Sequence, residues 1–261
     1  MSRLDAARIA AELEQLGCAL GPITVLDSTA STNDDARALA RSGCPHGAVV
    51  LADTQTAGRG RGAHRWHSPP EAGLYVSIVW RPQLDPSRLA WLALAGGVGV
   101  ARAVDQILEQ PRARIKWPND IYVDDRKLAG ILVEAQVNAR SATAILGVGL
   151  NVFTNEFPAE LDSVATSLVR LGARALERNR IAARLLASID AACRCVEGSL
   201  AQSLLDELAA RDWLLGRSVS VGDLVGIAAG IDAEGRLRVR TPDGSFHAIN
   251  SGEVSLQVAS R

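Results

Sequence analysis

Apolar positions along the chain follow two spacings, one typical of helices and one typical of strands. Apolar residues three or four positions apart predict helices over residues 4–16, 31–42, 86–107, 182–196 and 201–210. The helix over residues 86–107 should be interrupted at Gly96-Gly97. Short apolar or alternating runs predict strands over residues 23–26, 48–52, 74–80, 114–117, 121–123, 128–135 and 142–150. Asp124-Asp125-Arg126 should form a hairpin turn between two of them.

The character of the pattern changes toward the C-terminus. From Ser218 onward short β-rich runs are punctuated by glycines, at positions 222, 230, 235, 244 and 252. Such spacing fits a small β-barrel of SH3 size. We therefore expect an α+β protein, with a mixed β-sheet domain flanked by helices over residues 1–214 and an SH3-like β-barrel over residues 215–261.

Charge and composition narrow the function classes. The net charge of −1 gives no general attraction to nucleic acid or to a membrane surface. No apolar run looks long and uninterrupted enough to span a bilayer, and residues 1–21 are unlike a signal peptide, so we expect a cytoplasmic protein. Four cysteines without metal-ligand spacing indicate free thiols.

Lysine is almost absent from this chain. Of 28 basic side chains only two are lysine, Lys116 and Lys127, and they stand eleven positions apart. Arginine and lysine are interchangeable at most exposed positions, whereas a compact ammonium suits some sites that a planar guanidinium does not. The pair therefore indicates a functional segment, with chance as the alternative.

A polar, glycine-rich loop over residues 54–73 separates two predicted strands and contains the run Gln55-Thr-Ala-Gly-Arg-Gly-Arg-Gly62. Glycines let backbone N–H groups approach an anion, and Arg59 and Arg61 add groups suited to carboxylate or phosphate. We favour a small-ligand loop because only one short copy is present in a chain of neutral charge. An Arg/Gly segment that binds RNA loosely is the alternative.

Three further segments offer candidate ligand contacts. Lys116-Trp-Pro-Asn-Asp120 is read as a strand end, with an ordinary Asn-Asp turn as the alternative. Gly130, in the strand that Lys127 begins, would let a ligand approach the backbone. Gly147-Val-Gly-Leu-Asn151 repeats that feature and ends in an amide oxygen able to ligate Mg²⁺. Close packing of protein segments explains the glycines equally well.

Several familiar sites are missing from the sequence. The lysine positions rule out a Walker-type phosphate loop, and no Gly-x-Ser-x-Gly nucleophile motif occurs. The four histidines lack zinc-ligand spacing, and His64 and His67, which flank Trp66, are interpreted as polar loop residues. A Walker ATPase, a serine hydrolase of that type and a zinc enzyme are therefore disfavoured.

Taken in order, five segments resemble the biotin protein ligases: Ser31-Thr-Asn33, residues 55–61 with Trp66, residues 116–120, residues 126–130 and residues 147–151. The resemblance extends to the C-terminal Gly252-Glu-Val-Ser255. It implies that biotin and ATP react to give biotinyl-5′-AMP and pyrophosphate, and that biotin then passes to a lysine of the biotin carboxyl carrier protein of acetyl-CoA carboxylase. It also implies Mg²⁺ as a cofactor and a glycine-rich loop that closes over the adenylate.

The same resemblance assigns site residues. Lys127, Arg59 and Arg61 would be catalytic. Biotin would be held by Ser31, Thr32, Asn33, Gln55, Gly58, Arg59, Gly60, Arg61, Lys127, Gly130, Gly147 and Gly149. ATP would be held by Arg61, Trp66, Lys116, Asn119, Asp120, Lys127 and Asn151, with Asn151 also the candidate metal ligand.

Two points qualify the resemblance. Some members of the family carry an N-terminal winged helix-turn-helix, and about twenty residues before the first strand are too few for one, so we expect no binding of nucleic acid. A lipoate or octanoate ligase or transferase, which shares the fold, is the alternative enzyme. The oligomeric state stays open, with a homodimer as one form.

Overall fold

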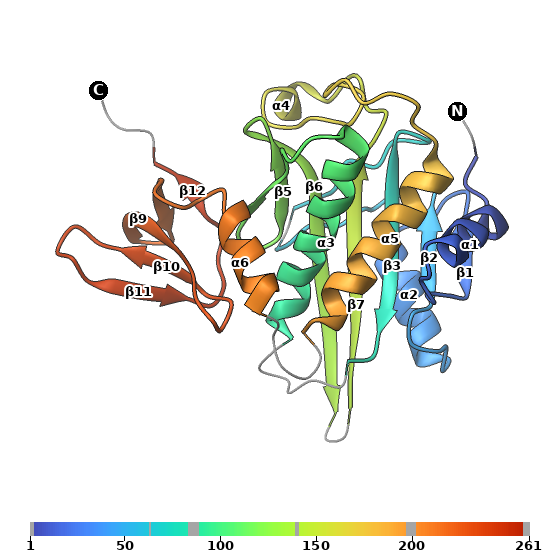
Figure 1. Cartoon of the computed structure of the whole chain (residues 1–261), viewed down its shortest axis with the longest axis horizontal. Coiled ribbons are helices and arrows are strands. Elements are labelled where there is room, and N and C mark those ends of the chain that lie inside the picture. The colour runs from blue at the N-terminus through green and yellow to red at the C-terminus, as the bar shows by residue number, and fades with distance from the viewer. Residues whose placement is uncertain (1–2, 63, 83–88, 139–140, 197–201, 258–261) are drawn as a thin grey trace.

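The computed structural model describes residues 3–62, 64–82, 89–138, 141–196 and 202–257. Within these residues the chain forms a seven-stranded sheet, a separate five-stranded sheet and six helices. Figure 1 shows the large sheet with helices against it, and the small sheet set to one side at the C-terminal end. The expected α+β class is confirmed.

The large sheet is mixed. Its strand order is β1-β2-β3-β7-β6-β5-β4, and β1 pairs parallel to β2 while every other neighbouring pair is antiparallel. The strands are β1 (Ile23–Leu26), β2 (Val49–Ala52), β3 (Gly73–Trp80), β4 (Arg114–Lys116), β5 (Asp120–Val123), β6 (Arg126–Asn138) and β7 (Ser141–Asn151). Asp124 and Asp125 both have positive φ, at 50° and 59°, and so form the expected hairpin turn between β5 and β6.

Helices cover the two faces of the large sheet unequally. In Figure 1, α3 (Ala90–Leu108) and α5 (Arg178–Arg194) lie side by side in front of it, with α1 (Ala6–Gln15) beside α5. Helix α2 (Thr32–Arg41) contacts β2, β3 and β7. Because side chains alternate between faces along a strand, neighbouring residues of β7 contact helices on opposite faces of the sheet. Leu146 packs toward α3 at Gly96, while Gly147 meets Asn33 at the start of α2.

Helix α3 differs from the sequence expectation in two ways. It runs without a break through Gly96-Gly97, because glycine allows close packing here: a Cβ on Gly96 would lie 3.2 Å from Leu146, and one on Gly99 only 2.6 Å from the Ile189 backbone. Residues 91–108 of α3 are also long and apolar enough to cross a membrane. No such run was expected from the sequence. Since 67% of that window is buried inside the protein, α3 has the burial of a core helix.

The C-terminal part forms an open antiparallel sheet in the order β11-β10-β9-β8-β12. Its strands are β8 (Ser218–Val221), β9 (Leu224–Ile231), β10 (Leu237–Arg240), β11 (Phe246–Ile249) and β12 (Ser255–Leu256). The sequence predicted a small SH3-like β-barrel; the five strands are present, and the edge strands β11 and β12 are not paired with each other within the described residues. Helix α6 (Gln202–Arg211) lies between the two sheets in Figure 1.

Most predicted elements are found, with shifted ends. Helix α5 begins four residues before its predicted start. Glu177 caps it there, because its side chain accepts hydrogen bonds from the backbone N–H groups of Asn179 and Arg180. The predicted starts at residues 86 and 201 lie outside the described residues. Helix α4 (Ala159–Asp162) was not expected. A hydrogen bond from Trp117 Nε1 to the Gly235 carbonyl, 3.0 Å long, joins the large-sheet domain to the C-terminal sheet.

Candidate active site

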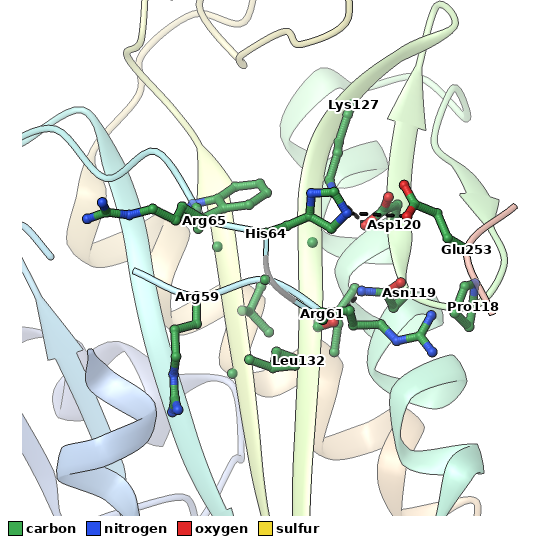
Figure 2. A pocket seen from close by; sticks show the side chains of 18 of the residues that line it. Arg59, Arg61, His64, Arg65, Pro118, Asn119, Asp120, Lys127, Leu132 and Glu253 are labelled. Atoms are coloured by element: carbon green, nitrogen blue, oxygen red, sulfur yellow. Dashed lines mark hydrogen bonds and ion pairs between the residues drawn. The ribbon is translucent and has the colours of Figure 1, made fainter. Parts of the chain in front are cut away.

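A cavity of about 800 Å³ lies on the face of the large sheet opposite α3 and α5. Its floor comes from β6 and β7, and its walls come from the start of α2, the loop over residues 54–73, the β4–β5 segment and residues 251–254 of the C-terminal part. Segments far apart in sequence therefore meet around one space, and Figure 2 shows the side chains that line it. The cavity has an uncharged polar end and a cationic end.

The uncharged end is built from side chains that hold one another in place. The Thr32 amide and hydroxyl both donate to Gln55 Oε1, at 3.0 and 3.2 Å. Ser77 Oγ, fully buried on β3, lies 2.6 Å from Asn33 Oδ1 and 2.8 Å from Thr32 Oγ1. Ser31, Thr32, Asn33 and Ser77 are buried and Gln55 is half-buried, and together they form a set of donors and acceptors around the N-terminus of α2. Ser77 was not among the residues that the sequence singled out.

The glycines of β6 and β7 make room for protein side chains. A Cβ on Gly147 would lie 2.1 Å from Asn33 Oδ1, and one on Gly149 would lie 2.3 Å from the Trp66 ring. Gly130 is also close to Trp66, at 3.1 Å. These glycines line the cavity as expected, but what approaches them directly is Asn33 and Trp66. The packing alternative raised from the sequence therefore describes their immediate contacts.

The cationic end contains both lysines of the chain. Lys127 Nζ lies 2.7 Å from Asp120 Oδ1 and forms an ion pair with it. This oxygen is buried, and it accepts no hydrogen bond from the described residues. Lys127 Nζ also lies 5.4 Å from the centroid of the Trp66 ring. Burial lowers the pKa of Lys116 from its usual 10.5, and the nearby charge of Lys127 acts in the same direction, while Asp120 opposes the shift. This end of the cavity thus places two ammonium groups where solvent is partly excluded, beside the carboxylates of Asp120 and Glu253.

Asn119 and Tyr122 support this cationic end. Asn119 donates from Nδ2 to the Ile131 carbonyl, at 2.7 Å, which fixes the turn between β4 and β5 against β6. The Lys116 ammonium lies 5.6 Å from the centroid of the Tyr122 ring, and burial raises the pKa of the Tyr122 phenol to about 12. Tyr122 therefore stays neutral and offers Lys116 an aromatic face.

The two arginines of the glycine-rich loop are placed differently. Arg61 reaches across the cavity and donates to the Gly252 carbonyl, at 3.2 Å. Arg59 turns away from the cationic end and pairs with Asp34 and Glu134, at 2.8 and 3.0 Å, as Figure 2 shows by the direction of its side chain. The structure therefore brings Arg61, but not the guanidinium of Arg59, toward the lysines. Arg59 was expected to be catalytic; it lines the cavity, with its guanidinium held in these two ion pairs.

Two expected residues do not line the cavity. Gly58 is enclosed by its own loop, since a Cβ there would lie 2.7 Å from Ser68 Oγ and 2.8 Å from the Trp66 carbonyl. Asn151 is buried at the end of β7, where its Nδ2 donates to the Thr166 carbonyl. It was expected at the nucleotide and the metal, and the chain around Thr166 covers it instead.

Further residues that were given no site role in the sequence analysis also line the cavity. His64 Nε2 lies 3.3 Å from Glu253 Oε2, so the loop and the C-terminal part meet over the cavity. Sequence spacing could not show this, because the two residues are 189 positions apart. Lining residues to which the sequence assigned no site role are Gly62, His64, Arg65, Trp117, Pro118, Tyr122, Ile131, Leu132, Val148, Ser251, Gly252, Glu253 and Val254.

Comparison with known proteins agrees with this arrangement. Residues 25–151 match the Biotin/lipoate A/B protein ligase family, and residues 214–257 match the Biotin protein ligase C terminal domain. The biotin--[acetyl-CoA-carboxylase] ligase of Mycobacterium tuberculosis is 38% identical over 90% of this chain and 89% of its own length. The bifunctional ligase/repressor BirA of Salmonella typhimurium is 34% identical over 98% of this chain and 79% of its own.

Solved structures give the same result. The biotin protein ligase from Aquifex aeolicus in complex with biotin and ATP matches with a TM-score of 0.79 and 28% identity, over 91% of this chain and 99% of that one. The match includes the large-sheet domain and reaches into the C-terminal part, because it covers nearly the whole chain. By sequence and by structure, this chain belongs to the biotin protein ligase family.

Proposed function

We propose that this protein is an ATP-dependent biotin protein ligase, which joins biotin and ATP into biotinyl-5′-AMP and then transfers biotin to a lysine of a carboxyl carrier protein. The observation that carries the proposal is the division of one cavity into an uncharged polar end and a cationic end. The cavity volume of about 800 Å³ is within the range of small-molecule sites. The family membership and the name of the Mycobacterium tuberculosis relative support the same activity.

The uncharged end favours biotin over lipoate or octanoate. Ser31, Thr32 and Asn33 are buried and Gln55 is half-buried, and their hydroxyl and amide groups can bond to the N–H and C=O groups of a ureido ring. An octanoyl chain or a dithiolane ring has no such groups, so it would gain no hydrogen bond from these side chains, which are already bonded within the protein. Leu132 and Val148 add apolar surface at the same cavity.

The cationic end supports the activation step. A biotin carboxylate attacking the α-phosphate of ATP brings two anions together, so preorganised positive charge lowers the barrier. Lys127 and Lys116 would supply it, with Arg61 closing the site from the loop. The adenylate is itself the activated intermediate, so no protein nucleophile is needed. A closed loop that keeps water from the adenylate would then preserve it until a carrier lysine arrives.

The residues at the cationic end fit Mg²⁺ bound together with nucleotide. Among the described residues no three histidine, cysteine, aspartate or glutamate side chains form a metal-binding group. Mg²⁺ is commonly held by one or two carboxylates plus substrate phosphates, and the Asp120 carboxylate, which pairs with Lys127 through Oδ1 in the free protein, would be such a group. Bound there, the ion would neutralise pyrophosphate charge. Asp120 replaces Asn151 in this proposal.

The remaining assignments rest on the same family membership. We infer that the acceptor is the biotin carboxyl carrier protein of acetyl-CoA carboxylase, and that the protein acts in the cytoplasm. We place the boundary between the ligase domain and the C-terminal domain at residue 214, where α6 has ended and the second family match begins. A homodimer is compatible with the fold.

The structure gives less support to RNA binding by the glycine-rich loop. Arg59 pairs with Asp34 and Glu134, Arg61 with the Gly252 carbonyl, and Arg65 with the Thr56 carbonyl, at 3.0 Å. Guanidinium groups already bonded within the protein are poorly available to a phosphate backbone.

Exchange of labelled pyrophosphate into ATP tests the proposed activation step. Exchange should depend on biotin, because it requires reversible formation of the adenylate. Lipoate and octanoate at the same concentration should support little exchange. Exchange that is independent of biotin would contradict the proposal, as would exchange that lipoate drives better.

A further inference from the structure

Arg59 holds the glycine-rich loop to two other elements. Its guanidinium pairs with Asp34 in the first turn of α2 and with Glu134 on β6. Arg37, one turn further along α2, pairs with the same two carboxylates, at 2.6 and 2.7 Å. Two arginines and two carboxylates therefore form one cluster, in which Arg59 is the member contributed by the loop.

The cluster is joined directly to the uncharged end of the cavity. Glu134 Oε2 accepts a hydrogen bond from Asn33 Nδ2, at 2.7 Å, and the same oxygen pairs with Arg59. Asn33 Oδ1 in turn lies against Ser77 Oγ and over Gly147. Loop position and the conformation of Asn33 are thus set by one carboxylate.

We propose that Arg59, Asp34 and Glu134 form a latch that retains the adenylate, and that Arg59 is a positioning residue for the loop. The inference rests on the proposed function and deepens it, because it assigns loop closure to a site separate from the reacting atoms. The three side chains are 38%, 47% and 30% exposed. Water therefore screens each pair, and removing one should have a graded effect.

The first test compares release of the adenylate with its formation. Biotinyl-AMP is formed on the enzyme, the enzyme is passed rapidly through a desalting column, and escape is followed by trapping. Arg59→Ala should raise the release rate about three- to tenfold, the scale of losing partly exposed ion pairs, and should lower the formation rate by a smaller factor. Arg59→Lys should recover part of the retention, since an ammonium can pair with one carboxylate. A larger loss of formation than of retention would overturn the latch.

A double substitution shows whether the residues act through one contact. Asp34→Asn and Glu134→Gln should each raise release, and adding either to Arg59→Ala should raise it little further. Effects on release that multiply in the double variants would contradict a shared latch.

A third measurement needs no substrate. Trypsin can cleave after Arg61 and Arg65, and both sites are intact in Asp34→Asn and Glu134→Gln. Loosening the latch should speed cleavage at these two arginines by a factor of about three or more, if opening limits cleavage. The matched control is Asp27→Asn, which removes a carboxylate paired with Arg3 at an exposed position. Equal cleavage of Asp34→Asn, Glu134→Gln and the control would overturn the proposal.

The two proposals fail separately. If the unmodified protein makes no adenylate, the proposed function is wrong, and cleavage by trypsin still tests whether Arg59 holds the loop. If adenylate forms and neither release nor cleavage responds to the substitutions, the latch is wrong and the ligase assignment stands.

Discussion

Lys127 and Asp120 form an ion pair inside the cavity, with 2.7 Å between Nζ and Oδ1. The lysine is the second residue of β6 and the aspartate is the first residue of β5, so the hairpin between these strands sets their distance. The ammonium also lies 5.4 Å from the centroid of the Trp66 ring. It is therefore held at the cationic end before any substrate binds.

Replacing Lys127 should affect the chemical step. Lys127→Ala should lower the rate of adenylate formation by about a hundredfold or more, the scale of one lost electrostatic contact in a transition state. Lys127→Arg should rescue poorly, because a planar, delocalised guanidinium does not replace a compact ammonium point charge. Single-turnover formation of biotinyl-AMP measures both. Full activity in the arginine variant would contradict the role given to a compact ammonium.

A substitution at Gly149 tests whether the position of the Trp66 ring matters for catalysis. A Cβ at this position would lie 2.3 Å from the ring, so Gly149→Ala should displace Trp66 and the loop. We expect adenylate formation and retention to fall by about tenfold, as when a positioning group shifts by roughly an ångström. Gly97→Ala is the matched control, since the nearest atoms there would be 3.8 Å away. Unchanged formation and retention of the adenylate in Gly149→Ala would mean that the position of Trp66 has no part in catalysis.

ATP binding should weaken as the solution becomes alkaline. The free protein holds Lys116 with a pKa below 10.5, because burial disfavours the charged ammonium. A bound triphosphate favours the protonated form, so ATP binds the protein best below that lowered pKa and loses affinity as pH rises through it. Titration of ATP binding against pH measures this. Lys116→Arg, which stays protonated, should remove that pH dependence, and an unchanged profile would exclude Lys116 from the nucleotide site.

Arg61 should also help to retain the adenylate, because it ties the loop to the C-terminal part, whereas Arg59 ties it to α2 and β6. The contact of Arg61 with the Gly252 carbonyl connects the loop to the C-terminal part. Arg61→Ala should therefore release biotinyl-AMP about tenfold to a hundredfold faster, the range for a lost hydrogen bond to a charged group. Labelling of lysines on albumin added as a free acceptor measures the escape. If specific and promiscuous labelling fall in equal proportion, Arg61 acts in the chemical step instead.

The sequence predicted the order of strands and helices well, because apolar spacing is local information. It also selected most residues of the cavity, since several of the motifs lie on β6 and β7, which form its floor. It could not assign Arg59, whose partners Asp34 and Glu134 are 25 and 75 positions away. Its contacts depend on how α2 and β6 pack, which spacing does not encode.

The two other differences have similar causes. Gly147, Gly149 and Asn151 are two positions apart along β7, so their side-chain positions share one face of the sheet. The chain around Thr166 covers that end of the strand, and Asn151 therefore does not reach the cavity. The contribution of residues 251–254 depends on the docking of the C-terminal sheet beside the loop. Tertiary packing decided both outcomes.

Identification of the adenylate tests the account most directly. The purified protein is incubated with ATP, Mg²⁺ and labelled biotin, lipoate or octanoate, and the products are separated by chromatography. The polar residues around Asn33 and the cations around Lys127 predict that biotin gives biotinyl-5′-AMP and that the other two acids give little adenylate. Formation of lipoyl-AMP or octanoyl-AMP in preference to biotinyl-AMP, or of no adenylate at all, would contradict it.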